Sequence, residues 1–153
     1  MSSNKGTHRE YSLNLPSRQD QIERVEELTD RVSKEMNFSE AERDKIAIAV
    51  TEAVNNAILH GNKLDPAKNV FIHISSNERS VTFSIRDQGS GFDPDSLPDP
   101  LDPQNLLKES GRGIFILRSL MDEVTFDFSD SGTEIVMVKY RNETDEQASE
   151  QDD

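Results

Sequence analysis

Two pairs of short alternating segments most constrain how this chain can fold. Residues 70–75 and residues 81–86 alternate apolar and polar side chains, and a short polar stretch joins them. Residues 124–128 and residues 133–140 repeat this pattern around a second turn. Period-two alternation is typical of strands with one buried face, and a short connection between two such strands is typical of a β-hairpin. The chain is therefore expected to contain two antiparallel hairpins.

A long helix is expected to begin at Ser39 and to run to about His60. Ser39 is a favourable N-cap, and Glu42, three residues later, completes a capping box. Gly61 follows as a natural C-terminal stop. The apolar side chains of this helix fall on one side and form its expected core stripe: Ile46, Val50, Val54, Ala57 and Ile58.

The other patterns complete a two-layer arrangement. Residues 10–15 alternate like a strand, and residues 18–36 and 113–121 have helical spacing. Residues 92–109 contain prolines and many turn formers, which is typical of a loop. Helices and antiparallel hairpins in this order favour an α/β (α+β) fold. We expect a two-layer sandwich of one mixed, mostly antiparallel sheet with helices on one face.

The chain of 153 residues has the length of one domain with a single core. Residues 1–6 are small and polar, and residues 1–9 are expected to form a flexible N-terminal segment. Residues 10–140 are expected to form the folded domain. Residues 141–153 carry many acidic and almost no apolar side chains, so they are expected to form an acidic disordered tail.

The composition argues against several classes of partner. Lys and Arg total 17 against 30 Asp and Glu, a net charge of -13, so a direct nucleic-acid partner or attachment to anionic lipid is not expected. Cysteine is absent, which removes disulfides and thiolate sites. No apolar run approaches the roughly 20 residues that span a bilayer, and the N-terminus lacks the apolar centre of a secretory signal. A cytoplasmic protein is the expected class.

A polar stripe lies on the long helix. Glu52, Asn56 and His60 recur every four residues and share an arc of roughly 80°. An Asn carbonyl oxygen is a hard ligand that suits Mg²⁺, and a carboxylate one turn away can accept a proton. A simple solvated face is the alternative, and His60 equally suits the helix dipole. Ala49 and Ala53 beside the stripe are expected to leave room for a ligand.

Asp87 ends the alternating segment 81–86, and Gly89 and Gly91 follow it. Glycines allow a backbone to approach a ligand closely. A carboxylate accepts hydrogen bonds and donates none, so it suits the exocyclic amine of adenine and not the carbonyl of guanine. A plain Asp-Gly turn is the alternative interpretation.

A second glycine pair, Gly111 and Gly113, precedes the apolar helix at residues 114–121. Exposed amides at a helix N-terminus bind phosphate oxygens, and the loop at residues 92–109 has the length of a lid. The pattern is neither a P-loop nor a Rossmann fingerprint, because the glycine spacing and the preceding element differ from both.

The three motifs in this order carry a resemblance to a known superfamily. The chain resembles the Bergerat-fold ATPases (GHKL, HATPase) and, among them, the bacterial anti-sigma factor serine/threonine kinases. The resemblance extends over residues 11–140. It rests on four stretches, at residues 49–61, 86–94, 111–118 and 132–135.

The resemblance implies a role for each polar candidate. Asn56 is similar to the magnesium ligand of the family, and Glu52 is similar to its general base. Asp87 is similar to the adenine-binding acid, with Thr133 supporting it through hydroxyl or water contacts. His60 is a further nucleotide-binding candidate.

The glycines of the second and third motifs resemble the phosphate and lid glycines of the family: Gly89, Gly91, Gly111 and Gly113. One position departs from the pattern. Some kinases of this family place an arginine just before the Ser-Gly of the third motif, where it can touch the γ-phosphate. In this chain the Ser-Gly is Ser110-Gly111, and Glu109 stands before it. Lys108 or Arg112 would have to supply that positive charge.

The resemblance implies an ATP-dependent serine/threonine kinase with Mg²⁺ that also acts as an anti-sigma factor. Its expected substrate is a STAS-domain anti-anti-sigma protein, its expected captive is a sigma factor, and a homodimer is expected. The main alternative is a non-catalytic binding module switched by nucleotide. A detached histidine-kinase domain and a slow ATPase with water as acceptor are further alternatives.

Overall fold

The computed structural model describes residues 8–89, 109–129 and 131–141. Five strands form one sheet in the order β1-β2-β3-β5-β4, and each neighbouring pair is antiparallel. The strands are β1 (Arg9–Pro16), β2 (Asn69–Ser76), β3 (Ser80–Arg86), β4 (Glu123–Ser129) and β5 (Gly132–Tyr140). The two-layer fold expected from the sequence is confirmed, and its sheet is antiparallel throughout the described strands.

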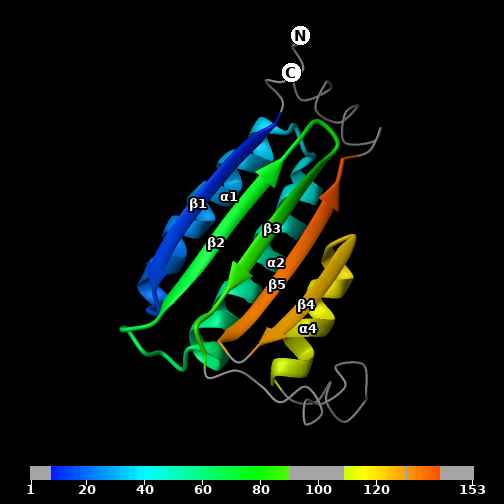
Figure 1. Cartoon of the computed structure of the whole chain (residues 1–153). Coiled ribbons are helices and arrows are strands. Elements are labelled where there is room, and N and C mark those ends of the chain that lie inside the picture. The colour runs from blue at the N-terminus through cyan, green and yellow to red at the C-terminus, as the bar shows by residue number, and fades with distance from the viewer. Residues whose placement is uncertain (1–7, 90–108, 130, 142–153) are drawn as a thin grey trace.

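The described helices all lie on one face of this sheet, and none of them covers the other face (Figure 1). They are α1 (Ile22–Glu35), α2 (Glu40–Asn56) and α4 (Glu109–Leu120), with a short 3₁₀ turn, η2 (Gln19–Gln21), before α1. Ser39 caps α2, because its side chain accepts a hydrogen bond from the backbone N–H of Glu42 at 3.2 Å. The expected N-cap is therefore confirmed.

The core lies between the sheet and the helices. The apolar stripe expected on the long helix is buried, from Ile46 at 0% exposure to Ala57 at 4%. Ala49 and Ala53 are also fully buried. The expectation that these two alanines leave room for a ligand is wrong, because their small side chains pack inside the core.

Two element boundaries differ from the sequence expectation. The α-helical part of the long helix ends at Asn56, and η3 (Ala57–Gly61) continues it as a π-helix in which the N–H of Asn62 bonds to the carbonyl of Ala57 at 2.8 Å. α4 begins at Glu109, so Gly111 and Gly113 lie inside the helix and do not precede it. Short π segments occur often at functional sites.

The expected boundaries of the domain fall partly on described residues. Arg9, expected in the flexible segment, is the first residue of β1. The backbone N–H of Arg141, at the expected start of the tail, donates to the carbonyl of Arg79 at 2.7 Å. The rest of the tail and most of the expected lid lie outside the described residues. None of the described helices is long and apolar enough to cross a membrane.

Candidate functional site

Four elements meet at one end of the sheet. α2 and β3 end there, and β5 and α4 begin there (Figure 1). This end therefore gathers the polar candidates of three distant stretches of sequence. Glu52 and Asn56 come from α2, Asp87 follows β3, and Thr133 stands at the start of β5.

Gly113 brings α4 against the polar stripe of α2. A Cβ atom placed on Gly113 would lie 2.6 Å from Oε2 of Glu52 and 3.0 Å from Nδ2 of Asn56. Only glycine allows so close an approach without a shift of these side chains. The carboxylate and the amide are therefore held together beneath the N-terminal half of α4. The sequence contained no signal for this contact, because it joins residues that are far apart in the chain.

Both polar side chains of this pair are half-buried. In the described part of the chain, which excludes the side chains of residues 109–112, the side chains of Glu52 and Asn56 make no hydrogen bond or ion pair. A carboxylate and an amide that share a half-buried position without partners therefore have the capacity to bind or to exchange a proton with a ligand.

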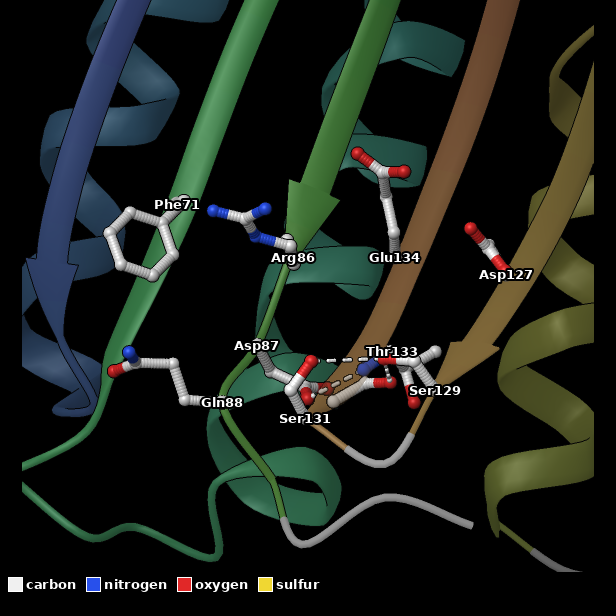
Figure 2. A pocket seen from close by; sticks show the side chains of 10 residues that line it. Phe71, Arg86, Asp87, Gln88, Asp127, Ser129, Ser131, Thr133 and Glu134 are labelled. Carbon is white, nitrogen blue, oxygen red and sulfur yellow. Dashed lines mark hydrogen bonds between the residues drawn. The ribbon is translucent and has the colours of Figure 1, made fainter. Parts of the chain in front are cut away.

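Asp87 continues the inward-facing side of β3 and is only 6% exposed. Its Oδ1 accepts hydrogen bonds from the N–H groups of Gly89 and Thr133, both at 3.0 Å. Its own N–H donates to the carbonyl of Thr133 at 3.0 Å, so the two residues bond reciprocally across β3 and β5 (Figure 2). The bond from Gly89 alone would be a plain Asp-Gly turn. The burial of Asp87 and the bond from Thr133 go beyond such a turn, because they fix the carboxylate in one position between β3 and β5.

The hydroxyl group of Thr133 is unusual. Thr133 is 8% exposed, and its Oγ1 is buried without a hydrogen-bond partner in the described part of the chain. An orphaned buried hydroxyl costs free energy unless a ligand or water completes it. Because Thr133 lines a pocket beside Asp87, its hydroxyl group is placed to bond to a ligand in that pocket.

The pocket has a volume of about 100 Å³ and lies between the end of α2 and the sheet. Its lining combines polar candidates with apolar side chains: Asn56, Ala57, His60, Gly61, Asp87, Ile114, Phe126, Phe128, Thr133 and Ile135. The rings of Phe126 and Phe128 are stacked, with their centroids 6.1 Å apart. An apolar wall opposite a few directed polar groups is typical of a small-molecule site.

This apolar wall was not predicted from the sequence. Phe126 and Phe128 alternate with polar residues on β4, so both face the helices, and this pattern is equally typical of core residues. The guanidinium carbon of Arg118 lies 5.6 Å from the centroid of the Phe126 ring. The alternation of apolar and polar residues on β4 predicted that the two rings face the helices. It could not indicate whether they line a pocket or pack in the core.

A larger hollow of about 410 Å³ lies on the face of the sheet that no described helix covers (Figure 2). It shares Asp87 and Thr133 with the small pocket, but Glu52 and Asn56 do not line it. On its floor, the guanidinium group of Arg86 lies 5.0 Å from the ring centroid of Phe71. The polar pair on α2 therefore belongs to the helix side of the sheet, and the hollow lies behind it.

The remaining candidates differ in how far they are described. His60 is exposed and lines the small pocket. Gly91 and Lys108 lie outside the described residues, and for residues 109–112 only the backbone is described. Gly111 and Arg112 belong to the first turn of α4, and the N–H groups of a first helical turn have no intrahelical partner and have the geometry to bind an anion.

Comparison with known proteins decides the family. The model of the histidine kinase-like ATPase domain matches residues 15–139. The chain belongs to this family. It is 32% identical over 117 residues to the serine-protein kinase RsbW of Bacillus subtilis, covering 72% of each chain. It is 39% identical over 102 residues to the anti-sigma F factor of Bacillus cytotoxicus, covering 65% of this chain and 70% of that one.

A solved structure shares the fold. The RsbU and RsbW domains of Rv1364c from Mycobacterium tuberculosis match with a TM-score of 0.64 at 16% identity, over 86% of this chain and 31% of that one. The curated relatives place the chain among the serine-protein kinases and anti-sigma factors of the histidine kinase-like ATPase family. The resemblance noted in the motifs is therefore confirmed.

Proposed function

We propose that this kinase phosphorylates a serine or threonine of a STAS-domain anti-anti-sigma protein in the cytoplasm, and that it sequesters a sigma factor. The observation that carries the proposal is the meeting of Glu52 and Asn56 at Gly113, next to the pocket of Asp87 and Thr133. The carboxylate of Glu52, the amide oxygen of Asn56 and the pocket that would hold the adenine base thus lie at one end of one sheet.

Asp87 would recognise the base of ATP. Its Oδ1 accepts hydrogen bonds from two backbone N–H groups, which orient the carboxylate. The other oxygen, Oδ2, would accept a hydrogen bond from the exocyclic amine of adenine. The hydroxyl group of Thr133 would complete its missing hydrogen bond beside this carboxylate. The stacked rings of Phe126 and Phe128 would bury the apolar parts of the heterocycle. A carboxylate favours adenine because guanine presents a carbonyl at the same position.

Asn56 would provide the protein ligand of Mg²⁺ through its amide oxygen. In the described residues, no three His, Cys, Asp or Glu side chains gather to hold a metal ion. The donor set still fits Mg²⁺, because that ion commonly takes one or two protein oxygens and completes its shell with water and substrate phosphates. Bound there, the ion would neutralise charge on the phosphates. The first-turn N–H groups of α4 would bind phosphate oxygens.

Glu52 would act as the general base. It would take the proton of the acceptor hydroxyl as the hydroxyl oxygen attacks the γ-phosphorus, while the bond from that phosphorus to the bridging oxygen breaks and ADP leaves. Within the described residues its carboxylate has no competing partner. Phosphoryl transfer depends mainly on positioning and charge stabilisation, so the packing of Glu52 against Gly113 is as important as its basicity.

The partners follow from the relatives and from the motifs. RsbW and anti-sigma F factor are named for kinase and anti-sigma action. By that likeness, phosphorylation would release the antagonist and leave the kinase free to bind its sigma factor. A homodimer is part of the same proposal.

A second candidate function is a binding module that uses nucleotide as a switch without transferring phosphate. The observation that favours it is Glu109. It stands just before Ser110-Gly111, where some kinases of the family that the motifs resemble place an arginine. An acidic side chain near the γ-phosphate would oppose the cationic surroundings that transfer requires.

The experiment that tests the proposal is transfer of labelled γ-phosphate from Mg-ATP to purified STAS-domain candidates, with the modified residue mapped by mass spectrometry. Label on one serine or threonine of a STAS protein is expected. Tight binding of both ATP and the STAS protein with no transferred label would contradict the kinase proposal and support the binding module.

A further inference from the structure

We propose that Asn62 positions the carboxylate of Asp87 and thereby sets the affinity for the adenine base of ATP. Asn62 itself does not line the small pocket beside Asp87 and Thr133. This inference rests on the proposed ATP site and adds a residue to it. Asn62 follows Gly61 just past the π-helix, and no part of the proposed chemistry uses it.

Asn62 is only 1% exposed, and its side chain bonds to three separate segments. Its Nδ2 donates to Oγ of Ser17 at 2.8 Å and to the carbonyl of Asn69 at 2.9 Å. Its Oδ1 accepts from the backbone N–H of Gln88 at 2.7 Å. One amide thus joins the end of β1, the start of β2 and the segment after β3, so its burial is fully compensated.

A second set of bonds closes the network. The hydroxyl group of Ser17, which is fully buried, donates to the carbonyl of Lys68 at 2.7 Å. The backbone N–H of Asn69 donates to Oε1 of Gln88 at 2.7 Å. Gln88 is therefore held both by its backbone, through Asn62, and by its side chain. Connected buried networks of this kind fix a single local geometry.

The network holds both neighbours of the Asp87 carboxylate. On one side is Gln88, the next residue in the chain (Figure 2). On the other side is Gly61, the residue before Asn62, whose backbone packs so tightly on Asp87 that an added methyl group would overlap Oδ2. Because Asn62 is covalently joined to Gly61 and hydrogen-bonded to Gln88, it fixes the space in which the carboxylate sits.

Loss of the Asn62 side chain would leave the N–H of Gln88 and the carbonyl of Asn69 short of a partner inside the protein. Unpaired buried groups drive local rearrangement toward water, and the segment that moves carries Asp87. The bond from carboxylate to adenine is a charge-assisted bond, and weakening it would reduce ATP affinity about tenfold. The affinity for GTP should stay unchanged, because guanine presents a carbonyl at the position of the adenine amine that this carboxylate would bind.

The first test needs no nucleotide. Hydrogen exchange by NMR would follow the amides of Gly89 and Thr133, which both donate to Oδ1 of Asp87. In Asn62→Ala we expect both amides to exchange faster, while the amide of Met36, bonded to Val32 at 3.1 Å, is unchanged. Exchange that is unchanged at Gly89 and Thr133, or that rises equally everywhere, would overturn the positioning role.

A matched control separates this effect from general loss of stability. Ser33→Ala removes a hydroxyl group that is 2% exposed and donates to the carbonyl of Thr29 at 2.8 Å, inside α1. It should leave exchange at Gly89 and Thr133 as in the unmodified protein. Ser17→Ala removes one of the three bonds of Asn62 and should give a smaller shift in the same direction. This milder variant keeps the test available if Asn62→Ala does not fold.

The second test measures binding of Mg-ATP and Mg-GTP by calorimetry. Asn62→Ala should lower ATP affinity about tenfold and leave GTP affinity unchanged, and it should add nothing in an Asp87→Asn background. Equal loss for both nucleotides, or full additivity with Asp87→Asn, would contradict the inference. If the unmodified protein binds neither nucleotide, the proposed ATP site fails, while the exchange result still decides whether Asn62 positions Asp87.

Discussion

The absence of a side chain at Gly113 makes room for the candidate catalytic pair. Gly113 leaves the space in which the carboxylate of Glu52 and the amide of Asn56 lie against α4. The two polar residues could be predicted from the sequence, because four-residue spacing on one helix is a local pattern. Their contact with Gly113 could not, because it depends on how α4 packs on α2.

Replacing Gly113 with Ala should move activity and stability in opposite directions. The added methyl group would displace the flexible ends of Glu52 and Asn56, and a displaced catalytic group lowers the transfer rate about tenfold to a hundredfold. The helix itself should become more stable by up to about 1 kcal/mol, because alanine is the better helix former. Single-turnover transfer and thermal unfolding measure the two effects. Ser119→Ala, on the exposed side of α4, is the control, and an unchanged transfer rate in Gly113→Ala would contradict the assignment.

Replacing Thr133 with Val tests the orphaned hydroxyl group. The free protein should be as stable as before or slightly more stable, because no hydrogen bond within the described chain is lost and an unpaired polar atom is removed. The affinity for ATP should fall about 3- to 10-fold. Thermal unfolding with and without Mg-ATP measures both effects, with the exposed Thr125→Val as the control. A loss of stability without nucleotide would show that the hydroxyl group serves the fold.

At the scale of elements, α2 is tied at both ends. Its C-terminal end continues as the π-helix toward Gly61 and Asn62. At its N-terminal end, Oε2 of Glu42 lies 2.7 Å from Nζ of Lys139, whose side chain is only 9% exposed, on β5. The helix start could be predicted from Ser39 and Glu42, because capping is local. The π-helix and the ion pair could not, because each depends on distant segments.

Glu42 should make stability depend on pH. Burial alone would raise the pKa of Glu42, but hydrogen bonds from Lys139 and Lys45 outweigh it and hold that pKa below its ordinary value. A carboxyl with a lowered folded-state pKa stabilises the protein above its unfolded-state pKa, and this contribution disappears as the pH falls through the folded-state value. Glu42→Gln should therefore lower the free energy of unfolding at pH 7 by about 1–2 kcal/mol.

The difference between Glu42→Gln and the unmodified protein should shrink as the pH falls below about 4, where the native carboxyl also becomes neutral. Urea unfolding at a series of pH values measures it. Glu40→Gln, on the same first turn but exposed, is the control for the helix dipole. A difference that stays constant down to acid pH would show that the charge of Glu42 is not what stabilises the helix.

At the scale of the whole molecule, the candidate site depends on the meeting of four element ends. The layers could be predicted from the sequence, because each strand and helix shows its own periodicity. The pocket wall from Phe126 and Phe128 and the network around Asn62 could not, because these residues show the same patterns as ordinary core or turn residues. What positions the site is therefore less visible in the sequence than the groups that would perform the chemistry.

The central claim is that this end of the sheet is one site with separable tasks: Asp87 binds the base and Glu52 accepts the proton. The most direct measurement is the dissociation constant for Mg-ATP together with the single-turnover transfer rate at saturating ATP, in Glu52→Gln and in Asp87→Asn. Glu52→Gln should keep ATP affinity and lose transfer. Asp87→Asn should weaken ATP binding about tenfold or more and keep most of the transfer rate at saturation. Equal loss of binding and transfer in both variants would contradict the account.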